Sequence, residues 1–154
     1  MQNYSRIIST GSYLPEKILT NKDLEKMVDT SHEWIIERTG IESRHIASED
    51  ESSVDMAYNA SINAIKNAGI DSNTIDMIIV ATTTPERKFP STAVLLQNKL
   101  KNNRAFAFDL NAACTGFIYA LDIANTYIKN GVANHVLVVG TEKITSLLDW
   151  SDRN

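Results

Sequence analysis

The segment "IDMIIVATTTP", residues 75–85, combines a continuous apolar run with an abrupt polar end. The apolar part has the length of a strand and is rich in β-branched side chains, which is typical of a strand covered on both faces. Two later segments have the same character, "RAFAFDL" at 104–110 and "HVLVVGTE" at 135–142. The sequence therefore predicts three buried strands after residue 74.

Helix-length segments separate these predicted strands. The first, "PSTAVLLQNKLK" at 90–101, places Pro90 near its expected first turn, and the second, "CTGFIYALDIANTYIKNG" at 114–131, stops at Gly131. Strands that alternate with helices in this way need crossover connections, which favour a largely parallel sheet with helices on its faces. The predicted fold class is therefore α/β.

Reactive groups in parallel α/β sheets gather beyond the carboxyl ends of the strands. Three polar segments lie at these positions: "TTTPERKFP" at 82–90, "NAAC" at 111–114 and "GTEK" at 140–143. We expect these segments to meet at one edge of the sheet, which is then the first place to look for a functional site.

The first half of the chain contains a long predicted helix, "SSVDMAYNASINAIKNAG" at 52–69. Its apolar and small side chains recur mostly on one helical face. Ser52 and Asp55 are suited to cap its start, and Gly69 is suited to end it.

Shorter elements are predicted before that helix. "RIISTGSYLP" at 6–15 opens with a short strand-like run that Gly11 and Pro15 close, and "TNKDLEKMV" at 20–28 indicates a short helix. "TSHEWIIERTG" at 30–40 predicts a second short helix, with Thr30 and Glu33 as a capping box and a left-handed Gly40 past its end.

Composition restricts the class of protein. With 43% hydrophobic and 22% charged residues, the chain fits a soluble compact domain rather than a disordered or fibrous protein. The longest clean apolar run, Met77 to Ala81, is far shorter than the roughly 20 residues that a membrane span requires. A net charge of −4, without clustered Lys or Arg, argues against a nucleic-acid surface. We therefore expect neither a membrane nor a nucleic acid as a partner.

The chain shows no internal repeat, low-complexity tract or long linker, so we predict one domain over residues 1–154. A single cysteine excludes an intrachain disulfide, and the start "MQNYSRIIST" lacks the features of a secretory signal. A cytoplasmic location is the resulting expectation. Because polar sequence follows the last predicted strand without a closing helix, we also expect the natural chain to continue beyond Asn154.

Cys114, the one cysteine, falls at the turn between the strand predicted to end near Leu110 and the helix predicted after it. The unpaired amides at a helix start favour a thiolate over a thiol. Ala112 and Gly116 are small and leave room for a substrate carbonyl, whose oxyanion the Cys114 amide is placed to stabilise. The alternative is a small buried packing residue, and the residues alone leave both interpretations open.

No histidine is placed by the sequence near Cys114 as a base. His32 falls on a predicted helix, His45 in a predicted loop and His135 at a strand start, so each is more simply a surface or structural histidine. The acidic run at 49–51 is most simply a solvated loop, and no metal site is predicted.

Four blocks of the sequence resemble a known family. They are "STGSYLPE" at 9–16, "TNKDLEKMVDTSHEWIIERTGIESRHIA" at 20–47, "IIVATTTPERKFPSTA" at 78–93 and "DLNAACTGFIYAL" at 109–121. Together they are similar to the N-terminal half of bacterial β-ketoacyl-acyl-carrier-protein synthase III, a condensing enzyme that initiates fatty acid synthesis. The surroundings of Cys114 are shared with other thiolase-fold enzymes, whereas the block that runs through Arg44 is far more diagnostic.

The resemblance implies a fold and a reaction. The fold would be one half of the duplicated five-layered αβαβα thiolase-like architecture, with a mixed, mostly parallel sheet, and the second thiolase-like domain would lie outside this chain. Cys114 would accept an acetyl or similar short acyl group from coenzyme A, and malonyl-acyl-carrier protein would lose carbon dioxide and attack the thioester. The family's catalytic histidine and asparagine lie in the second half, so we expect this chain alone to be inactive.

The resemblance also implies a coenzyme A site. Trp34 and Arg38 stand four apart on one predicted helix face, and the residues alone favour an Arg lying over a packed Trp. In the family, the residue that matches Trp34 stacks on the adenine of coenzyme A, and the residue that matches Arg153 covers the opposite face. Thr30 and Arg38 match nearby nucleotide contacts.

Partners follow from the same resemblance. Phe89 matches a residue that reaches across a homodimer to line the partner's acyl pocket, although taken alone it is equally well a loop anchor before Pro90. Acyl-coenzyme A and malonyl-acyl-carrier protein would be substrates, with no tightly bound cofactor. Two alternatives stay open: another thiolase-superfamily condensing enzyme that makes a branched or aromatic ketone, and an inactive truncated interaction domain with a structural cysteine.

Overall fold

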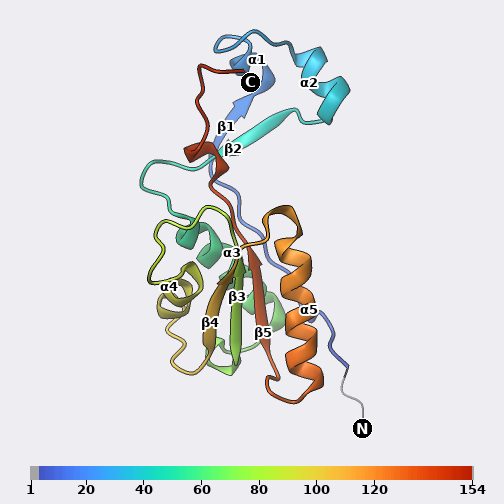
Figure 1. Cartoon of the computed structure of the whole chain (residues 1–154), viewed down its shortest axis with the longest axis vertical. Helices are drawn as coiled ribbons and strands as arrows, with labels where there is room; N and C mark the ends of the chain where they lie inside the picture. The colour runs from blue at the N-terminus through green and yellow to red at the C-terminus, as the bar shows by residue number, and fades with distance from the viewer. Residues whose placement is uncertain (1–3, 154) are drawn as a thin grey trace. The chain divides into compact units, whose positions relative to one another are not determined.

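The computed structural model describes residues 4–153 and contains a parallel three-stranded sheet (Figure 1). Its strands are β3 (Met77–Ala81), β4 (Phe106–Leu110) and β5 (Val136–Gly140), in the spatial order β4-β3-β5. Both neighbours run parallel to β3. The predicted α/β class, the three strands and their parallel direction are confirmed.

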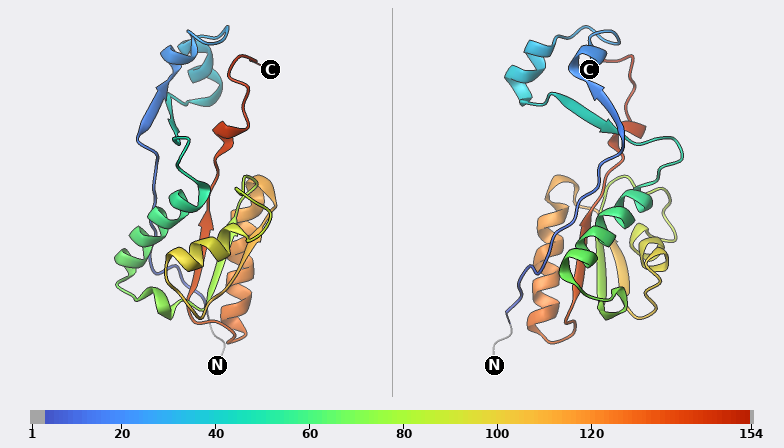
Figure 2. Two further views of the ribbon diagram at one scale, coloured as in Figure 1. Left: turned by 90° about the vertical axis from the view of Figure 1, so that its left-hand side faces the viewer. Right: turned by 180° about the vertical axis from the view of Figure 1, so that it is seen from behind.

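Helices cover both faces of this sheet (Figure 2). The helices α3 (Ser53–Ala68) and α4 (Thr92–Lys99) lie on one face, and α5 (Gly116–Lys129) lies on the other.

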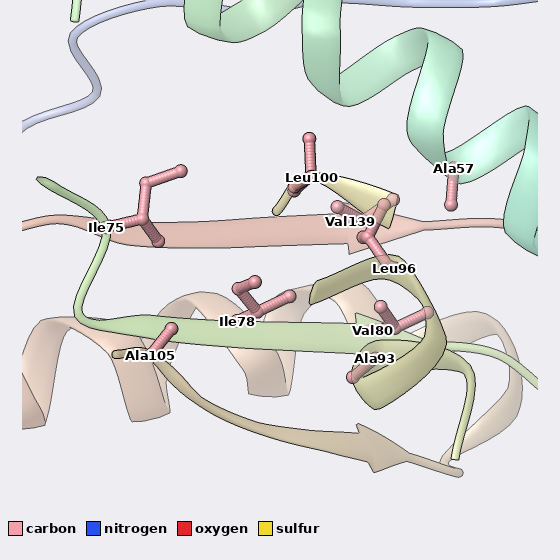
Figure 3. Packing of buried hydrophobic residues seen from close by; sticks show 9 residues of the cluster. All are labelled: Ala57, Ile75, Ile78, Val80, Ala93, Leu96, Leu100, Ala105 and Val139. Atoms are coloured by element: carbon pink, nitrogen blue, oxygen red, sulfur yellow. The ribbon is translucent and has the colours of Figure 1, made fainter. Parts of the chain in front are cut away.

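Side chains alternate along β3 between these two layers. Ile78 and Val80 belong to the apolar cluster under α3 and α4 (Figure 3), whereas Met77 and Ile79 pack under α5. All four side chains are fully buried. Burial of an aliphatic side chain of this size stabilises a fold by about 1.5–3 kcal/mol. The central strand therefore joins the two halves of the core.

The register of the sheet brings the carboxyl ends of its strands together. Ala81, the last residue of β3, is level with Leu110 on one side and with Gly140 on the other. Pairing continues one step further, because the Thr82 amide donates to the Leu110 carbonyl and the Thr141 amide donates to the Ala81 carbonyl. The polar segments after the strands therefore begin at one edge, as predicted.

The predicted ends of α3 are also confirmed. The Ser52 hydroxyl accepts a hydrogen bond from the Asp55 amide, the Asp55 carboxylate accepts one from the Ser52 amide, and Gly69 ends the helix with a φ of 66°. At α4 the capping residue is Ser91. Pro90 lies just before this cap, next to the first turn of the helix.

The chain divides into two compact units. The first contains Ser52–Glu142 and the N-terminal segment that ends at Tyr13, and the second contains Leu14–Glu51 and the segment from Lys143 onward. The second unit contains an antiparallel pair of strands, two short helices and a 3-10 turn (Ile144–Ser146). The strands are β1 (Lys17–Thr20) and β2 (Ser43–Ile46), and the helices are α1 (Asn21–Leu24) and α2 (His32–Thr39). The sequence pattern does not predict β2, and the prediction that His45 lies in a loop is wrong, because His45 belongs to β2. The organisation as one domain stays a prediction.

The start of α2 corrects a predicted cap. Ser31, and not Thr30, is the capping residue, because its hydroxyl accepts a hydrogen bond from the Trp34 amide. The proposed capping box of Thr30 and Glu33 is therefore wrong. Two neighbouring hydroxyl residues offer the same chemistry, and the pattern alone does not choose between them. The predicted end is confirmed, since Gly40 has a φ of 68°.

The strand predicted at 6–15 is absent from the described part of the chain. The carbonyls of Thr10 and Ser12 instead accept hydrogen bonds from Asn67 and Asn63 of α3. Side chains of a helix thus satisfy carbonyls that a neighbouring strand would otherwise bind, and the segment lacks a strand partner.

Two helices are shorter than their patterns suggest. Within the predicted range 20–28, α1 stops at Leu24, and the amides of Met27 and Val28 both donate to the Leu24 carbonyl. A helix this short gains little because its first turn is costly to form. α5 starts at Gly116 rather than at Cys114, and its predicted stop is confirmed by the left-handed Gly131, with a φ of 70°.

The cap of α3 can be tested through Asp55. Hydrogen bonds from the Lys99 ammonium and from Ser52 hold the pKa of Asp55 at about 2, below its ordinary value of 3.8. A carboxyl whose pKa is lower in the folded state stabilises that state above the unfolded pKa, and the stabilisation is lost as the pH falls through the folded pKa. We expect Asp55→Asn to lower the free energy of unfolding by about 1 kcal/mol at neutral pH, as other cap losses do.

Urea unfolding at a series of pH values measures this effect. The difference between the parent protein and Asp55→Asn should shrink as the pH falls from 3.8 toward 2. The exposed Asp50→Asn is the matched control and should differ little from the parent at any pH. A difference that stays constant through this range would contradict the assignment.

Candidate functional site

Cys114 lies on the turn between β4 and α5. β4 ends at Leu110, one 3-10 turn spans Ala113–Thr115, and α5 begins at Gly116. The Cys114 side chain is a free, exposed thiol. The predicted strand-to-helix position is confirmed, and the alternative of a buried packing residue is wrong for this structure.

The backbone before Cys114 is strained. Ala113 has a φ of 47°, in the left-handed region that non-glycine residues rarely adopt. Such a conformation costs about 1–3 kcal/mol and persists only where the surroundings hold it in place. Gly116 helps to hold this conformation because it lets α5 lie close to the sheet. A Cβ atom at this residue would lie 3.3 Å from the Cβ of Ala81 at the end of β3. The close approach of α5 to the sheet therefore holds Cys114 at the edge where the strands end.

A second polar group links the ends of β3 and β5. Glu142, which follows β5, accepts hydrogen bonds from the amide of Thr83 at 2.8 Å and from its hydroxyl at 3.1 Å. The hydroxyls of Thr84 and Thr82 donate to the same carboxylate, that of Thr82 at 3.5 Å. One carboxylate thus holds the first three residues after β3.

The sequence pattern does not predict this network, although both segments stand out as polar runs after buried strands. The available signal is three threonines directly after one buried strand and a carboxylate soon after another. A carboxylate is a strong acceptor for several donors at once. The missing information is the strand order, because only the direct pairing of β3 with β5 brings together residues 60 positions apart.

The loop between β3 and α4 is fixed at both ends. Near its start, the Ser53 hydroxyl donates to the Thr84 carbonyl. At its far end, the Asp109 carboxylate of β4 accepts hydrogen bonds from the amides of Thr92 and Ala93, at 2.8 and 2.7 Å. The strand that leads to Cys114 therefore also positions the first turn of α4.

Phe89 lies within this loop, and its side chain is 88% exposed. A side chain that anchors a loop is buried beneath it. The interpretation of Phe89 as a loop anchor is therefore wrong for this structure, and the ring is presented to solvent.

The other predicted binding residues belong to the second unit. The guanidinium carbon of Arg38 lies 4.9 Å from the centre of the Trp34 ring, and that of Arg153 lies at the same distance. Trp34 itself is 42% exposed. Each contact is a cation–π interaction, worth about 0.5–1 kcal/mol at an exposed site. Thr30 lies on the segment that leads into α2, just before the capping residue Ser31.

The site residues predicted from the sequence thus fall into two groups, one in each compact unit. Cys114 and Phe89 belong to the first unit. The second unit contains the four residues predicted to bind coenzyme A: Thr30, Trp34, Arg38 and Arg153.

The three histidines have polar neighbours of their own. A ring nitrogen of His32 lies beside the Asn21 amide, one of His45 beside the Pro15 carbonyl, and one of His135 beside the Thr74 carbonyl. These contacts support structural roles.

Residues 4–153 contain no candidate metal site and no candidate membrane span. No group of three or more His, Cys, Asp or Glu side chains in this range is arranged to hold a metal ion. Among the same residues, every helix is too short or too polar to cross a membrane.

Comparisons with known sequences point to one family. The family model of 3-oxoacyl-[acyl-carrier-protein (ACP)] synthase III matches residues 108–154. A beta-ketoacyl-[acyl-carrier-protein] synthase III of Xanthomonas oryzae pv. oryzae is 56% identical over 150 residues, which cover 97% of this chain and 46% of the relative. The corresponding protein of Ehrlichia canis is 54% identical over 150 residues, covering 97% of this chain and 47% of the relative.

Solved structures agree with these sequence matches. The 3-oxoacyl-[acyl-carrier-protein] synthase III from Aquifex aeolicus VF5 has a TM-score of 0.93 and 54% identity, covering 96% of this chain and 48% of that one. The priming beta-ketosynthase from the R1128 polyketide biosynthetic pathway has a TM-score of 0.95 and 41% identity, covering 99% of this chain and 46% of that one.

These matches show a thiolase-like fold, and the chain spans about half the length of the relatives it matches. The chain belongs to the β-ketoacyl-acyl-carrier-protein synthase III family and corresponds to the N-terminal half of these relatives.

Proposed function

We propose that this chain provides the nucleophile for the initiating condensation of fatty acid synthesis. In this proposal Cys114 takes an acetyl or similar short acyl group from coenzyme A, and condensation with malonyl-acyl-carrier protein gives 3-oxoacyl-acyl-carrier protein. The observation that supports it most is the exposed thiol of Cys114, on a strained turn at the edge where three parallel strands end. The 56% identity to a beta-ketoacyl-[acyl-carrier-protein] synthase III adds to this support.

The proposed chemistry follows from the properties of a thiolate. The Cys114 sulfur attacks the acyl carbonyl, and coenzyme A leaves as its own thiolate. The malonyl thioester then loses carbon dioxide, its α-carbon attacks the carbonyl of the acylated cysteine, and the Cys114 sulfur leaves. The Cys114 amide is the donor that we propose for the oxyanion in both steps.

We further propose that the nucleotide end of coenzyme A binds at Trp34. The ring carries two guanidinium groups at 4.9 Å, and Arg is suited to both aromatic and phosphate recognition. An adenine stacked between Trp34 and Arg153 needs about 7 Å between them, at roughly 3.5 Å for each stacked layer. Binding in this mode therefore requires Arg153 to move away from the ring, while Arg38 and Thr30 contact the rest of the nucleotide.

The proposal also includes a dimer partner, the substrates and a cellular location. We propose that Phe89 contacts a second copy of the chain, because aromatic side chains are enriched at protein interfaces. The acyl donor and malonyl-acyl-carrier protein act as substrates, no cofactor is tightly bound, and the location is the cytoplasm. Residues 1–154 form the first of two thiolase-like domains in this proposal, and the second matches the other half of the relatives.

A second candidate function keeps the fold and changes the acyl group. It is supported by the TM-score of 0.95 to a priming beta-ketosynthase of a polyketide pathway. Acylation rates of Cys114 with a series of acyl-coenzyme A donors separate the two candidates. A preference for acetyl-coenzyme A favours fatty acid initiation, and a preference for branched or aromatic donors favours the second candidate.

The first test concerns the reactivity of the thiol. At neutral pH we expect iodoacetamide to alkylate Cys114 faster than it alkylates free cysteine, because the amides at the start of α5 favour the anion. Peptide mapping over time measures the rate at this residue. Alkylation no faster than that of free cysteine would contradict the proposed thiolate.

The second test is the condensation itself, in the protein at its natural length. Cys114→Ala should form no acetoacetyl-acyl-carrier protein from acetyl-coenzyme A and malonyl-acyl-carrier protein, because no thioester can form on alanine. The exposed Asn103→Ala is the control and should retain full activity. Undiminished product from Cys114→Ala would refute the proposed nucleophile.

A preparation of residues 1–154 alone should form no product, since the family's histidine and asparagine lie in the other half. Product from this preparation would show that this chain contains the whole catalytic set.

A further inference from the structure

We propose that Asn21 is a positioning residue for the nucleotide site, because it holds α2, the helix that carries Trp34 and Arg38. The inference rests on the proposed function. It adds a residue that touches neither the substrate nor the reacting atoms and acts only through the placement of α2.

Asn21 is a buried polar side chain, only 1% exposed. Burial of an amide costs free energy unless its polar atoms are hydrogen-bonded, so the partners of this side chain matter for the local structure. Its nitrogen donates to the Ile41 carbonyl at 2.8 Å and lies 3.3 Å from the Nδ1 atom of His32. Its oxygen accepts a hydrogen bond from the Arg44 guanidinium.

These partners fix the orientation of the Asn21 amide. A carbonyl only accepts and a guanidinium only donates, so the nitrogen must face Ile41 and the oxygen must face Arg44. The second hydrogen of the nitrogen then points to His32, whose Nδ1 must act as an acceptor. Both amide hydrogens and the oxygen are therefore used.

The two residues that accept from Asn21 lie at opposite ends of α2. His32 is the first residue of the helix, and Ile41 follows Gly40, which ends it. Arg44, the donor to the Asn21 oxygen, lies on β2. One side chain thus connects both ends of α2 to the strand pair.

Another hydrogen bond also holds the start of α2, because the Glu25 carboxylate accepts from the His32 amide at 2.6 Å. Of its eight residues, only Ile35 is buried, so apolar packing contributes little to its placement. Trp34 and Arg38 are on this helix, so the 4.9 Å between the Arg38 guanidinium carbon and the centre of the Trp34 ring depends on the geometry of α2. A shift of α2 moves the stacking surface as a unit, and misplacement by about 1 Å is enough to lower a rate strongly.

Two acyl donors distinguish this positioning role from a general effect on folding. Acetyl-coenzyme A carries the nucleotide, whereas acetyl-pantetheine presents the same thioester without it. Acetylation of Cys114 by each donor is measured by peptide mapping in the protein at its natural length, across a range of donor concentrations. Trp34→Ala serves as the reference for loss of the nucleotide contact.

The variants form a matched pair at His32, with Asn21→Asp as a third. His32→Leu removes the acceptor for Asn21, whereas His32→Asn keeps an acceptor oxygen near the place of Nδ1. We expect His32→Leu to lower the rate constant at low acetyl-coenzyme A by about tenfold or more, with the maximal rate preserved. Acetylation by acetyl-pantetheine should be unchanged, and His32→Asn should restore most of the loss.

Asn21→Asp removes both donated hydrogen bonds and should behave as His32→Leu does. An equal loss with both donors, or a His32→Asn variant as impaired as His32→Leu, would overturn the inference. If the unaltered protein is acetylated by neither donor, the proposed function fails instead. In that case, calorimetric binding of adenosine 3′,5′-bisphosphate tests the inference by itself. We expect the unaltered protein to bind this nucleotide and His32→Leu to bind it more weakly. Equal binding by the two proteins, or binding by neither, would contradict the inference.

Discussion

The pairing of β3 with a parallel strand on each side is the constraint on which the candidate active site depends. Met77, Ile78, Ile79 and Val80 are fully buried, and they alternate between the two apolar clusters of the first unit. Because the strands are parallel and in register, their carboxyl ends lie at one edge. The turn with Cys114, the threonines after β3 and Glu142 after β5 all start from that edge.

The two compact units are stabilised in different ways. The first has an apolar core on both faces of a sheet. Among the described residues of the second, Pro15 and Ile35 are the buried apolar side chains, and polar contacts contribute much of the stabilisation. Asn21 joins α2 to β2, and the Lys143 ammonium donates to three carbonyls of the segment before α3, those of Ser48, Glu49 and Glu51. A unit held in this way opens at a lower free energy than an apolar core does.

The fold was predictable wherever a local sequence pattern determines the structure. Buried strands appear as apolar runs, and the ends of α3 are marked by Ser52, Asp55 and Gly69. Two of the failures share one cause, which is that a partner distant in the sequence decides the outcome. Residues 9–12 bind α3 through hydrogen bonds instead of forming a strand, and β2 is a polar segment that becomes a strand only through its pairing with β1.

The features of the candidate site also fall into those that a local pattern predicts and those that depend on residues distant in the sequence. The position of Cys114 at a strand-to-helix turn follows from local pattern, and the resemblance to the family assigns it a role. The hydrogen bonds of Glu142 to three threonines depend on strand order, and those of Asn21 depend on how four segments meet, so neither was available from the sequence.

If Cys114 is the nucleophile, the acyl group is bound to its sulfur before condensation, and this acyl-enzyme can be detected by itself. The protein at its natural length is incubated with acetyl-coenzyme A in the absence of malonyl-acyl-carrier protein, and its peptides are mapped by mass spectrometry. We expect one acetyl group on the peptide that contains Cys114, held as a thioester and therefore released by hydroxylamine. An unmodified Cys114 peptide, or acetylation at another residue, would contradict it.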